Sequence, residues 1–315
     1  HPLVYADLHE MGADGTYYFA PEAEPYNPNI TKAQREALHL FGRNNAKWFD
    51  RFGFDYFTRE VYDAFYPGYG DSWPAYQGAV SMTYEQASVR GLVVRESNGN
   101  VLHFRDAVRH HFTASLSTAE CAAANRETLL QDFYRYRRSA IEEGRKEKVR
   151  EFILPRGRDA AATDKLAGLL VEQGVEVSRA VAPFTAGGRQ YAAGTYVVPL
   201  AQPAKRLIRT LLDPVTPMDE PFVNAEEARR RTRQRSEIYD VTAWSLPLMF
   251  NVEAVARPET SEGKFEPANA VRILPGEMHG GKASVAYLVP WGTAAAGRLL
   301  AAALREDLRV LSTDK

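Results

Sequence analysis

Strand-like and helix-like segments alternate along most of this chain, and that order restricts the fold to the α/β class. Short apolar runs at residues 3–8 and 79–88 have the composition of buried strands, and the spacing of apolar residues predicts a helix at 32–50 between them. Thr31 stands at the start of that helix, where a hydroxyl group can cap free backbone N–H groups. A strand, a helix and another strand therefore form the first α/β part.

A second series of such segments follows a charged stretch that ends near residue 147. Gly174 stands where a helix is expected to end, because glycine adopts the left-handed conformation of that position without strain. We therefore expect two α/β domains, residues 1–147 and 148–315, with the second cut before its natural end. The predicted elements of the second domain are strands at 149–155, 175–181, 194–200 and 283–291 and helices at 159–174, 203–214 and within 294–310, where a helix leads into a strand.

Three connecting segments are predicted within residues 1–147. Residues 62–78 concentrate aromatic residues among Pro and Gly, which predicts an irregular loop. Asn98-Gly99 is a pair favoured in tight turns, so a β-hairpin is expected around it. Ser117 and Glu120 have the spacing of a capping box, which predicts a helix from there to about residue 146.

The overall charge and the cysteine content narrow the kinds of partner. With 39 basic and 40 acidic residues, the formal net charge of −1 gives no preference for nucleic acid, and no run approaches the roughly 18 apolar residues that insert into a membrane. The basic run at 227–237 is flanked by glutamates and is predicted to be a solvated helix face. Cys121 is the single cysteine and is predicted to be buried, so a metal would need His and carboxylate ligands.

Two polar residues in or beside apolar strands are candidates for chemistry. His9 follows the first strand, at the kind of edge where open α/β sheets hold their ligands, and its imidazole can bind a metal or make a simple hydrogen bond. Glu85 lies within the second strand, and a buried carboxylate must be paired in a salt bridge, solvated by a cleft or placed near a cation. The residues alone leave these alternatives open.

The first 115 residues contain four phrases that resemble the M14 family of zinc carboxypeptidases, in particular its long bacterial members with an extra α/β region behind the peptidase domain. The order and spacing of the phrases carry the resemblance more than any one of them. It implies that residues 1–147 are the C-terminal half of a mixed-sheet peptidase domain and that the parent protein is secreted or periplasmic. The phrases are DLHEMGADGTYYFAP, NPN, FYPGYGDSW and GAVSMTYEQASVRG.

The resemblance also implies a reaction and its residues. His9 matches the family's second zinc-ligating histidine, and Glu85 matches its catalytic glutamate. The implied activity is hydrolysis at the C-terminus of a peptide, with Zn2+ activating a water molecule and Glu85 moving its proton. A tyrosine on a mobile loop before the glutamate is implied to hold the substrate; Tyr66 is the first candidate, with Tyr62 and Tyr69 as alternatives.

The family's other zinc ligands, a His-x-x-Glu motif, do not precede His9 in this sequence. Because catalytic zinc generally needs three protein ligands, we expect the chain to be a fragment, inactive as a peptidase unless the upstream half of the domain is supplied. Downstream, His103-x-x-Asp106 stands in the wrong order for the family. The adjacent His110 and His111 are predicted to be surface residues.

Two other functions fit the same residues. A non-catalytic protein could use the peptidase-like cleft to bind peptide ends while the second α/β region docks a partner. A cell-wall peptide amidase would apply the same metal chemistry to a different amide. Zinc content and a panel of peptide and muropeptide substrates distinguish the three functions.

Overall fold

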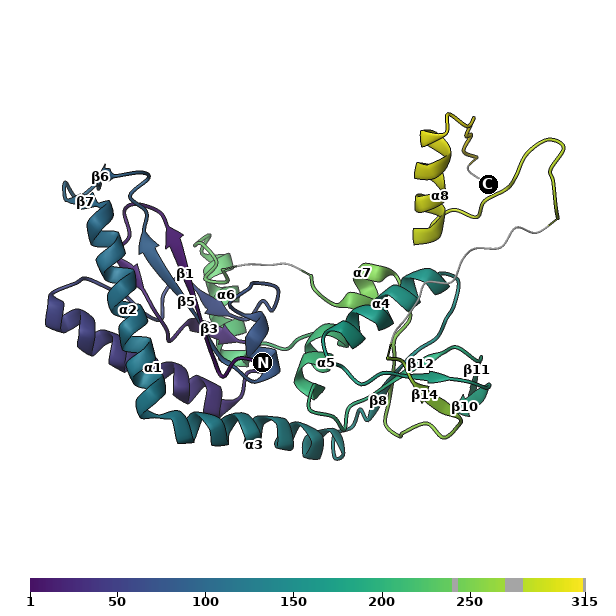
Figure 1. The fold of residues 1–315 in the computed structure, drawn as a ribbon, viewed down its shortest axis with the longest axis horizontal. Coiled ribbons are helices and arrows are strands. Elements are labelled where there is room, and N and C mark those ends of the chain that lie inside the picture. The colour runs from purple at the N-terminus through teal and green to yellow at the C-terminus, as the bar shows by residue number, and fades with distance from the viewer. Residues whose placement is uncertain (240–242, 270–279, 314–315) are drawn as a thin grey trace. The chain divides into compact units, whose positions relative to one another are not determined.

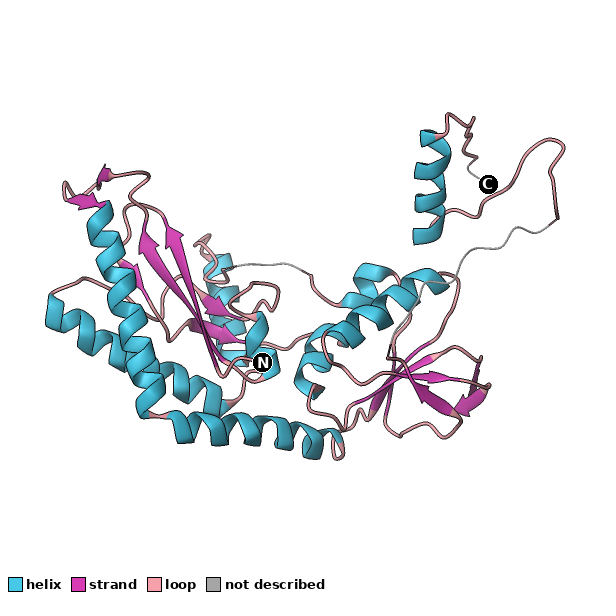
Figure 2. Cartoon of the chain, in the orientation of Figure 1, coloured by secondary structure: helices cyan, strands magenta, loops and turns pink. Residues whose placement is uncertain are grey.

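The computed structural model describes residues 1–239, 243–269 and 280–313. The fold is α/β, with helices accompanied by several small sheets rather than by one large one (Figure 2). The α/β class expected from the alternation of segments is therefore confirmed.

The chain divides into two compact units. The first contains residues 1–140 and 209–244, and the second contains residues 141–208 and 245–315. Residues 209–244 fall in the second domain by sequence order but pack with the first unit. The first unit is thus built from two separate stretches of chain.

The first unit is organised around a mixed sheet in the order β1-β5-β2, of which β1 and β5 lie side by side in Figure 1. β1 (Val4–Met11) runs parallel to β5 (Val80–Ala87), and β2 (Tyr17–Tyr18) pairs antiparallel with the other edge of β5. The strands predicted at 3–8 and 79–88 are confirmed. This unit also contains a two-stranded sheet formed by β3 (Ala23–Tyr26) and β4 (Asp63–Ala64). Its second stretch of chain contributes helix α6 (Glu220–Arg231).

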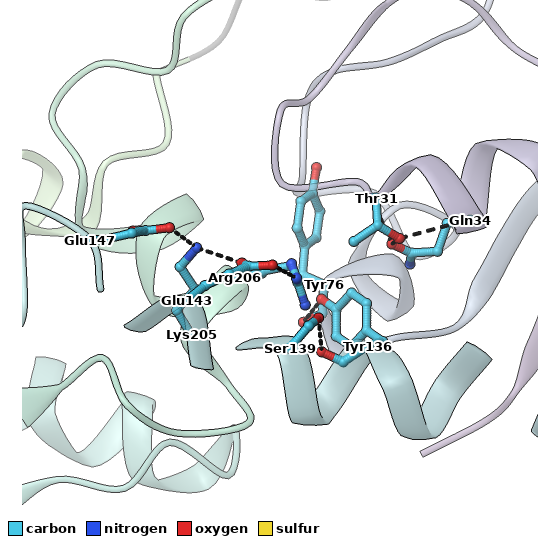
Figure 3. Close-up of polar contacts among 9 residues, drawn as sticks. All are labelled: Thr31, Gln34, Tyr76, Tyr136, Ser139, Glu143, Glu147, Lys205 and Arg206. Carbon is cyan, nitrogen blue, oxygen red and sulfur yellow. Dashed lines mark hydrogen bonds and ion pairs between the residues drawn. The ribbon is translucent and has the colours of Figure 1, made fainter. Parts of the chain in front are cut away.

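Helix α1 (Lys32–Phe52) confirms the helix predicted at 32–50 and begins at a capping box. The hydroxyl oxygen of Thr31 accepts a hydrogen bond from the backbone N–H of Gln34 at 3.4 Å, and the Gln34 side-chain oxygen accepts from the backbone N–H of Thr31 at 2.9 Å (Figure 3). The two bonds satisfy backbone donors that a helix start leaves free. The helix ends at Gly53, whose φ of 68° is left-handed.

The helix predicted from Ser117 is wrong in its start and in its continuity. Helix α2 (Phe104–Ala124) begins much earlier, and α3 (Arg126–Gly144) follows after a break at Asn125. Ser117 is buried inside α2, where the side-chain amide of Asn44 on α1 donates to its carbonyl oxygen at 2.8 Å. Glu120 accepts a hydrogen bond from the Trp48 indole at 2.7 Å. The apparent capping residues therefore hold α2 against α1.

Of the two connecting segments predicted before α2, the hairpin is found as expected and the irregular loop only in part. The hairpin is confirmed: β6 (Val93–Arg95) and β7 (Val101–His103) pair antiparallel, and Gly99 in the turn has a φ of 93°. The loop at 62–78 is not wholly irregular, because it contains β4 and the 3₁₀-helix η1 (Trp73–Gln77).

The second unit holds a sheet whose described strands lie in the order β13-β8-β12-β9-β14, with every neighbouring pair antiparallel. The predicted strand-helix-strand unit appears as β8 (Glu151–Leu154), α4 (Ala160–Glu172) and β9 (Ser178–Ala180), and Gly174 follows the helix with a φ of 78°. β12 (Tyr196–Pro199) lies between β8 and β9. The crossover therefore joins strands that run in the same direction but are not neighbours.

Apolar side chains close one side of this sheet. Ile153 and Val197 from the central strands pack with Phe184, Tyr191 and the partly buried Phe265. The remaining elements are β10 (Phe184–Ala186), β11 (Arg189–Tyr191), β13 (Val255–Arg257), β14 (Phe265–Pro267), α5 (Lys205–Leu212), α7 (Leu246–Phe250) and α8 (Ala294–Arg305).

Near the C-terminus, α8 confirms the helix expected within 294–310, but the strands do not form. Residues 283–291 and 306–310 are described and contain no strand. Val285 and Leu288 are almost fully exposed. A strand needs a neighbour for its backbone groups, and the described residues offer these segments none.

Lys205, at the start of α5, is buried beside two acidic residues, one in the last turn of α3 and one just after it. Its ammonium group lies 2.9 Å from a carboxylate oxygen of Glu143 and also contacts Glu147 (Figure 3). Glu143 accepts a second bond from Arg206 at 2.5 Å. The ion pairs compensate for removing two cations from water and tie the start of α5 to the end of α3.

Candidate functional site

His9 and Glu85 are direct partners in the parallel pairing of β1 with β5. Paired residues on neighbouring strands point to the same face of a sheet, and Asp7 shares that face because side chains alternate along a strand. His9 and Glu85 stand near the carboxyl ends of their strands, the edge at which α/β sheets hold ligands. The two residues singled out from the sequence are therefore brought together.

The opposite face of the same strands packs on helices. Tyr84, the neighbour of Glu85, is fully buried, and its hydroxyl group lies 2.7 Å from the hydroxyl oxygen of Thr118 on α2. In Figure 1, α1 and α2 lie together beside β5. The alternation of side chains thus separates a structural face from a face that carries the candidate site.

Glu85 is only 7 % exposed, and its Oε2 atom is buried without a hydrogen-bond partner. Burial raises the pKa of Glu85 to about 7; the nearby His9 opposes this shift, and the acidic Asp7 and Asp71 add to it. A carboxyl group with a pKa near neutrality is present in both protonation states there. It can therefore accept a proton and return it, as a general acid and base must.

The side chain of His9 is 62 % exposed, in contrast to that of Glu85. Its Nδ1 atom lies 3.4 Å from Oδ2 of Asp7, an arrangement in which a carboxylate orients an imidazole. Nε2 is then the nitrogen that remains for a ligand. The sequence reasoning did not single out Asp7 as an orienting group, although its position two residues before His9 places it on the same face.

The described residues do not form a complete metal site. No three His, Cys, Asp or Glu side chains among them are grouped closely enough to hold a metal ion. His9 offers one imidazole, whereas catalytic zinc generally has three protein ligands. The donors on this face therefore fit one ligand position of such a site and do not fit the whole of it.

The tyrosines of the loop before β5 belong to one aromatic cluster, because the rings of Tyr62 and Tyr69 lie 5.2 and 6.2 Å from that of Tyr239. The Tyr66 ring packs 5.0 Å from that of Tyr69 and 5.8 Å from that of Trp244, measured between ring centres. The Tyr62 ring packs 4.7 Å from that of Tyr18, which is the register partner of Glu85 on β2. Burial raises the pKa of Tyr62, and the charge of Glu85 raises it further. The phenol of Tyr62 is thus close enough to Glu85 to be affected by its charge.

The adjacent histidines of α2 are half-buried and face the sheet, so the prediction of surface residues is wrong. Nδ1 of His110 lies 2.9 Å from Oε1 of Gln86, and Nδ1 of His111 lies 2.9 Å from the hydroxyl oxygen of Tyr17. Burial lowers the pKa of both imidazoles. Both histidines thus contact the sheet, His110 at β5 and His111 at β2.

Cys121 and the basic run behave as the sequence predicts. Cys121 is buried, and burial raises the pKa of its thiol. Helix α6, which carries most of the basic run, buries none of its residues. Among the described residues, no helix combines the length and the apolar character that crossing a bilayer requires.

The titration of Glu85 gives a testable dependence of stability on pH. Its pKa in the folded protein, about 7, lies above the ordinary 4.5, so the folded state binds more protons between these values and the free energy of unfolding falls as pH rises from about 4.5 to 7. After allowance for solvent near the site, the free energy of unfolding of the wild type should fall by on the order of 1–2 kcal/mol over this range. The Glu85→Gln variant should lack this fall, because glutamine does not titrate. Urea titrations at pH 5 and pH 8 measure it; an equal drop in wild type and variant would contradict the assignment.

Comparison of the chain with protein-family models, with curated proteins and with solved structures finds no match. The chemistry of the site is therefore inferred from the side chains that β1 and β5 bring together. These are an exposed imidazole oriented by Asp7 and a buried carboxyl group beside it.

Proposed function

We propose that the chain forms part of a zinc carboxypeptidase of the M14 type, which hydrolyses the C-terminal bond of a peptide. His9 is one zinc ligand and Glu85 is the general base. The remaining ligands are those of the family's His-x-x-Glu motif, in the upstream half of the peptidase domain. The observation that carries the proposal is the register pairing of His9 with Glu85 at the carboxyl ends of two parallel strands.

The chain's own residues have defined tasks in this proposal. Asp7 holds the imidazole of His9 in one orientation. Glu85 takes a proton from the attacking water and delivers it to the leaving amine, a task that its pKa of about 7 supports. Zinc, when bound, supplies a Lewis acid that polarises the scissile carbonyl group.

A tyrosine of the loop before β5 contacts the peptide substrate in this proposal. Tyr66 is the candidate suggested by the sequence. Its alternative Tyr62 has the support of geometry, because its ring lies against Tyr18 and its phenol senses the charge of Glu85. A phenol beside the general base can donate a hydrogen bond to the substrate backbone or its terminal carboxylate.

A non-catalytic peptide-binding protein is the second candidate function. The observation that favours it is that the described residues group fewer than three metal-binding side chains in any one place. In that case the exposed His9 and the buried Glu85 recognise a peptide end without cleaving it. The two candidates differ in whether the protein holds zinc.

Metal analysis of the longest natural form of the chain separates these candidates. We expect about one tightly bound zinc per chain, and we expect His9→Ala to lose it because a catalytic site cannot spare one of three protein ligands. His103→Ala is the matched control. His103 starts the His-x-x-carboxylate sequence that lies in the wrong order for the family, so its replacement should leave zinc bound. A wild-type protein without zinc, or a His9→Ala variant that keeps it, would contradict the proposal.

A further inference from the structure

Five arginines lie within seven residues at the end of α6 and just after it. They are Arg229, Arg230, Arg231, Arg233 and Arg235. We call residues 231–237 the arginine loop; all of them are exposed, and only the first still belongs to α6. The helix itself buries none of its residues. The arginines therefore stand on an open, solvated part of the chain.

The arginine loop is bound to α6, so it can open without disturbing a buried core. Glu226 of this helix accepts hydrogen bonds from the Ser236 hydroxyl group at 2.6 Å and from the Glu237 backbone N–H at 3.0 Å. Arg233 has a φ of 57°, a left-handed conformation that is strained in residues other than glycine. Exposed segments with few buried contacts open at low free-energy cost. The extended conformation in which proteases bind their substrates is therefore within reach of this loop.

Basic residues stand side by side at three other places in the sequence, and the structure makes each of them less open. The pair at 137–138 lies inside helix α3, whose backbone is bonded to itself. The pair at 205–206 is buried. The turn at 145–146 is exposed, but it is flanked by Glu143 and Glu147, whose ion pairs to the buried pair hold it in place. Adjacent cations and an accessible backbone thus coincide in the arginine loop.

The planar guanidinium group of arginine is always charged and binds carboxylates through paired N–H···O bonds. Acidic subsites of an endopeptidase therefore recognise closely spaced arginines. We propose that such an endopeptidase cleaves this chain in the arginine loop, after Arg231, Arg233 or Arg235. The oxygen of one water molecule joins the carbonyl carbon of that arginine, the C–N bond to the next residue breaks, and a proton passes to the leaving nitrogen. This cleavage site does not depend on the hydrolytic function proposed for His9 and Glu85.

The sheet of the second unit holds the two fragments together after the cut. Its three central strands, β8, β12 and β9, precede the arginine loop, whereas both edge strands, β13 and β14, follow it. β13 pairs with β8 and β14 pairs with β9, each along three residues. The Phe265 ring of β14 packs 5.1 Å from that of Phe184, and the backbone N–H of Ser261 donates to the buried Glu151 at 3.0 Å. The product is therefore a two-chain protein.

Brief digestion of the 315-residue chain with a limiting amount of kexin, an endopeptidase that cleaves after paired basic residues, tests the site. Mass spectrometry should place the first cut after an arginine of the loop. The triple variant Arg230→Gln, Arg231→Gln, Arg233→Gln should lose its intact chain at least about tenfold more slowly, because its loop offers no paired cations. The matched control, Arg145→Gln with Lys146→Gln, removes an exposed basic pair from another turn and should be digested at the wild-type rate.

Size-exclusion chromatography of the cut protein tests the two-chain product. We expect the fragments to elute together in buffer and to separate in urea. Circular dichroism shows that the variants are folded before their rates are compared. A first cut outside the arginine loop, or equal digestion rates of the triple variant and the wild type, would overturn the cleavage site. Fragments that separate in buffer would overturn the two-chain product.

Discussion

Replacing Glu85 with glutamine should lower the rate of peptide hydrolysis by the zinc-loaded longest natural form about 10²- to 10⁴-fold while leaving the KM nearly unchanged. Glutamine keeps the shape of the side chain but cannot accept the proton of the attacking water. Zinc should remain bound, because Glu85 is assigned to proton transfer and not to the metal. Initial rates at several peptide concentrations, together with zinc content, measure the effect.

Glu36→Gln is the control for this substitution. It makes the same chemical change on a side chain that is 65 % exposed on α1. We expect wild-type rates from it. A Glu85→Gln variant that hydrolyses the peptide at the wild-type rate would remove Glu85 from the reaction, whatever the metal content.

Replacing Asp164 with alanine should lower the free energy of unfolding of the second unit by about 3–5 kcal/mol. Asp164 is 2 % exposed and binds Arg156 through two hydrogen bonds of 2.7 and 2.8 Å, and the Tyr196 hydroxyl group donates to it at 2.9 Å. Alanine would leave the guanidinium group largely buried without its anion and the phenol without its acceptor. Leaving a buried charge and a buried hydroxyl group without partners costs more free energy than the net contribution of the lost hydrogen bonds.

Urea unfolding followed through amide exchange of β8 and β12 measures this loss. β8 ends just before Arg156, β12 begins with Tyr196, which bonds to Asp164, and the two strands pair within the sheet. The matched control is Glu253→Ala, which breaks another carboxylate pair with arginine, that of Glu253 with Arg189. Both of those side chains are about half exposed and the pair is screened by solvent, so the loss should be much smaller than that from Asp164→Ala. Equal losses of unfolding free energy in the two variants would contradict the claim that the buried pair stabilises the unit more than the exposed one.

The elements of the first unit that could be predicted are those with a local signal. α1 has apolar residues at helical spacing, a capping threonine and a terminal glycine, and each has its expected place. β1 and β5 are short apolar runs, which suits strands covered on at least one face. These features depend on neighbouring residues only, so the sequence contains them directly.

The errors arose where distant contacts decide the local structure. The Ser117 and Glu120 spacing imitates a helix start, but both residues bond to α1 instead. The apolar run at 283–291 has the composition of a strand and lacks a partner strand among the described residues. Composition alone cannot distinguish these cases, because pairing and packing involve residues far away in the sequence.

The candidate site was predictable in part for the same reason. His9 and Glu85 could be selected because a polar residue in or after an apolar strand is unusual. Their direct pairing could not be predicted, since the register is set by contacts between strands that are separated by more than 60 residues. Asp71 lies in an irregular loop with no periodicity, and its effect on Glu85 appears only when the chain is folded.

Product analysis by mass spectrometry tests the central claim most directly. The longest natural form, loaded with zinc, is incubated with a peptide that has a free C-terminus and with the same peptide amidated there. The account predicts release of a single residue from the C-terminus of the free peptide and little or no release from the amidated one. No cleavage of either peptide, or cleavage at internal bonds, would contradict it.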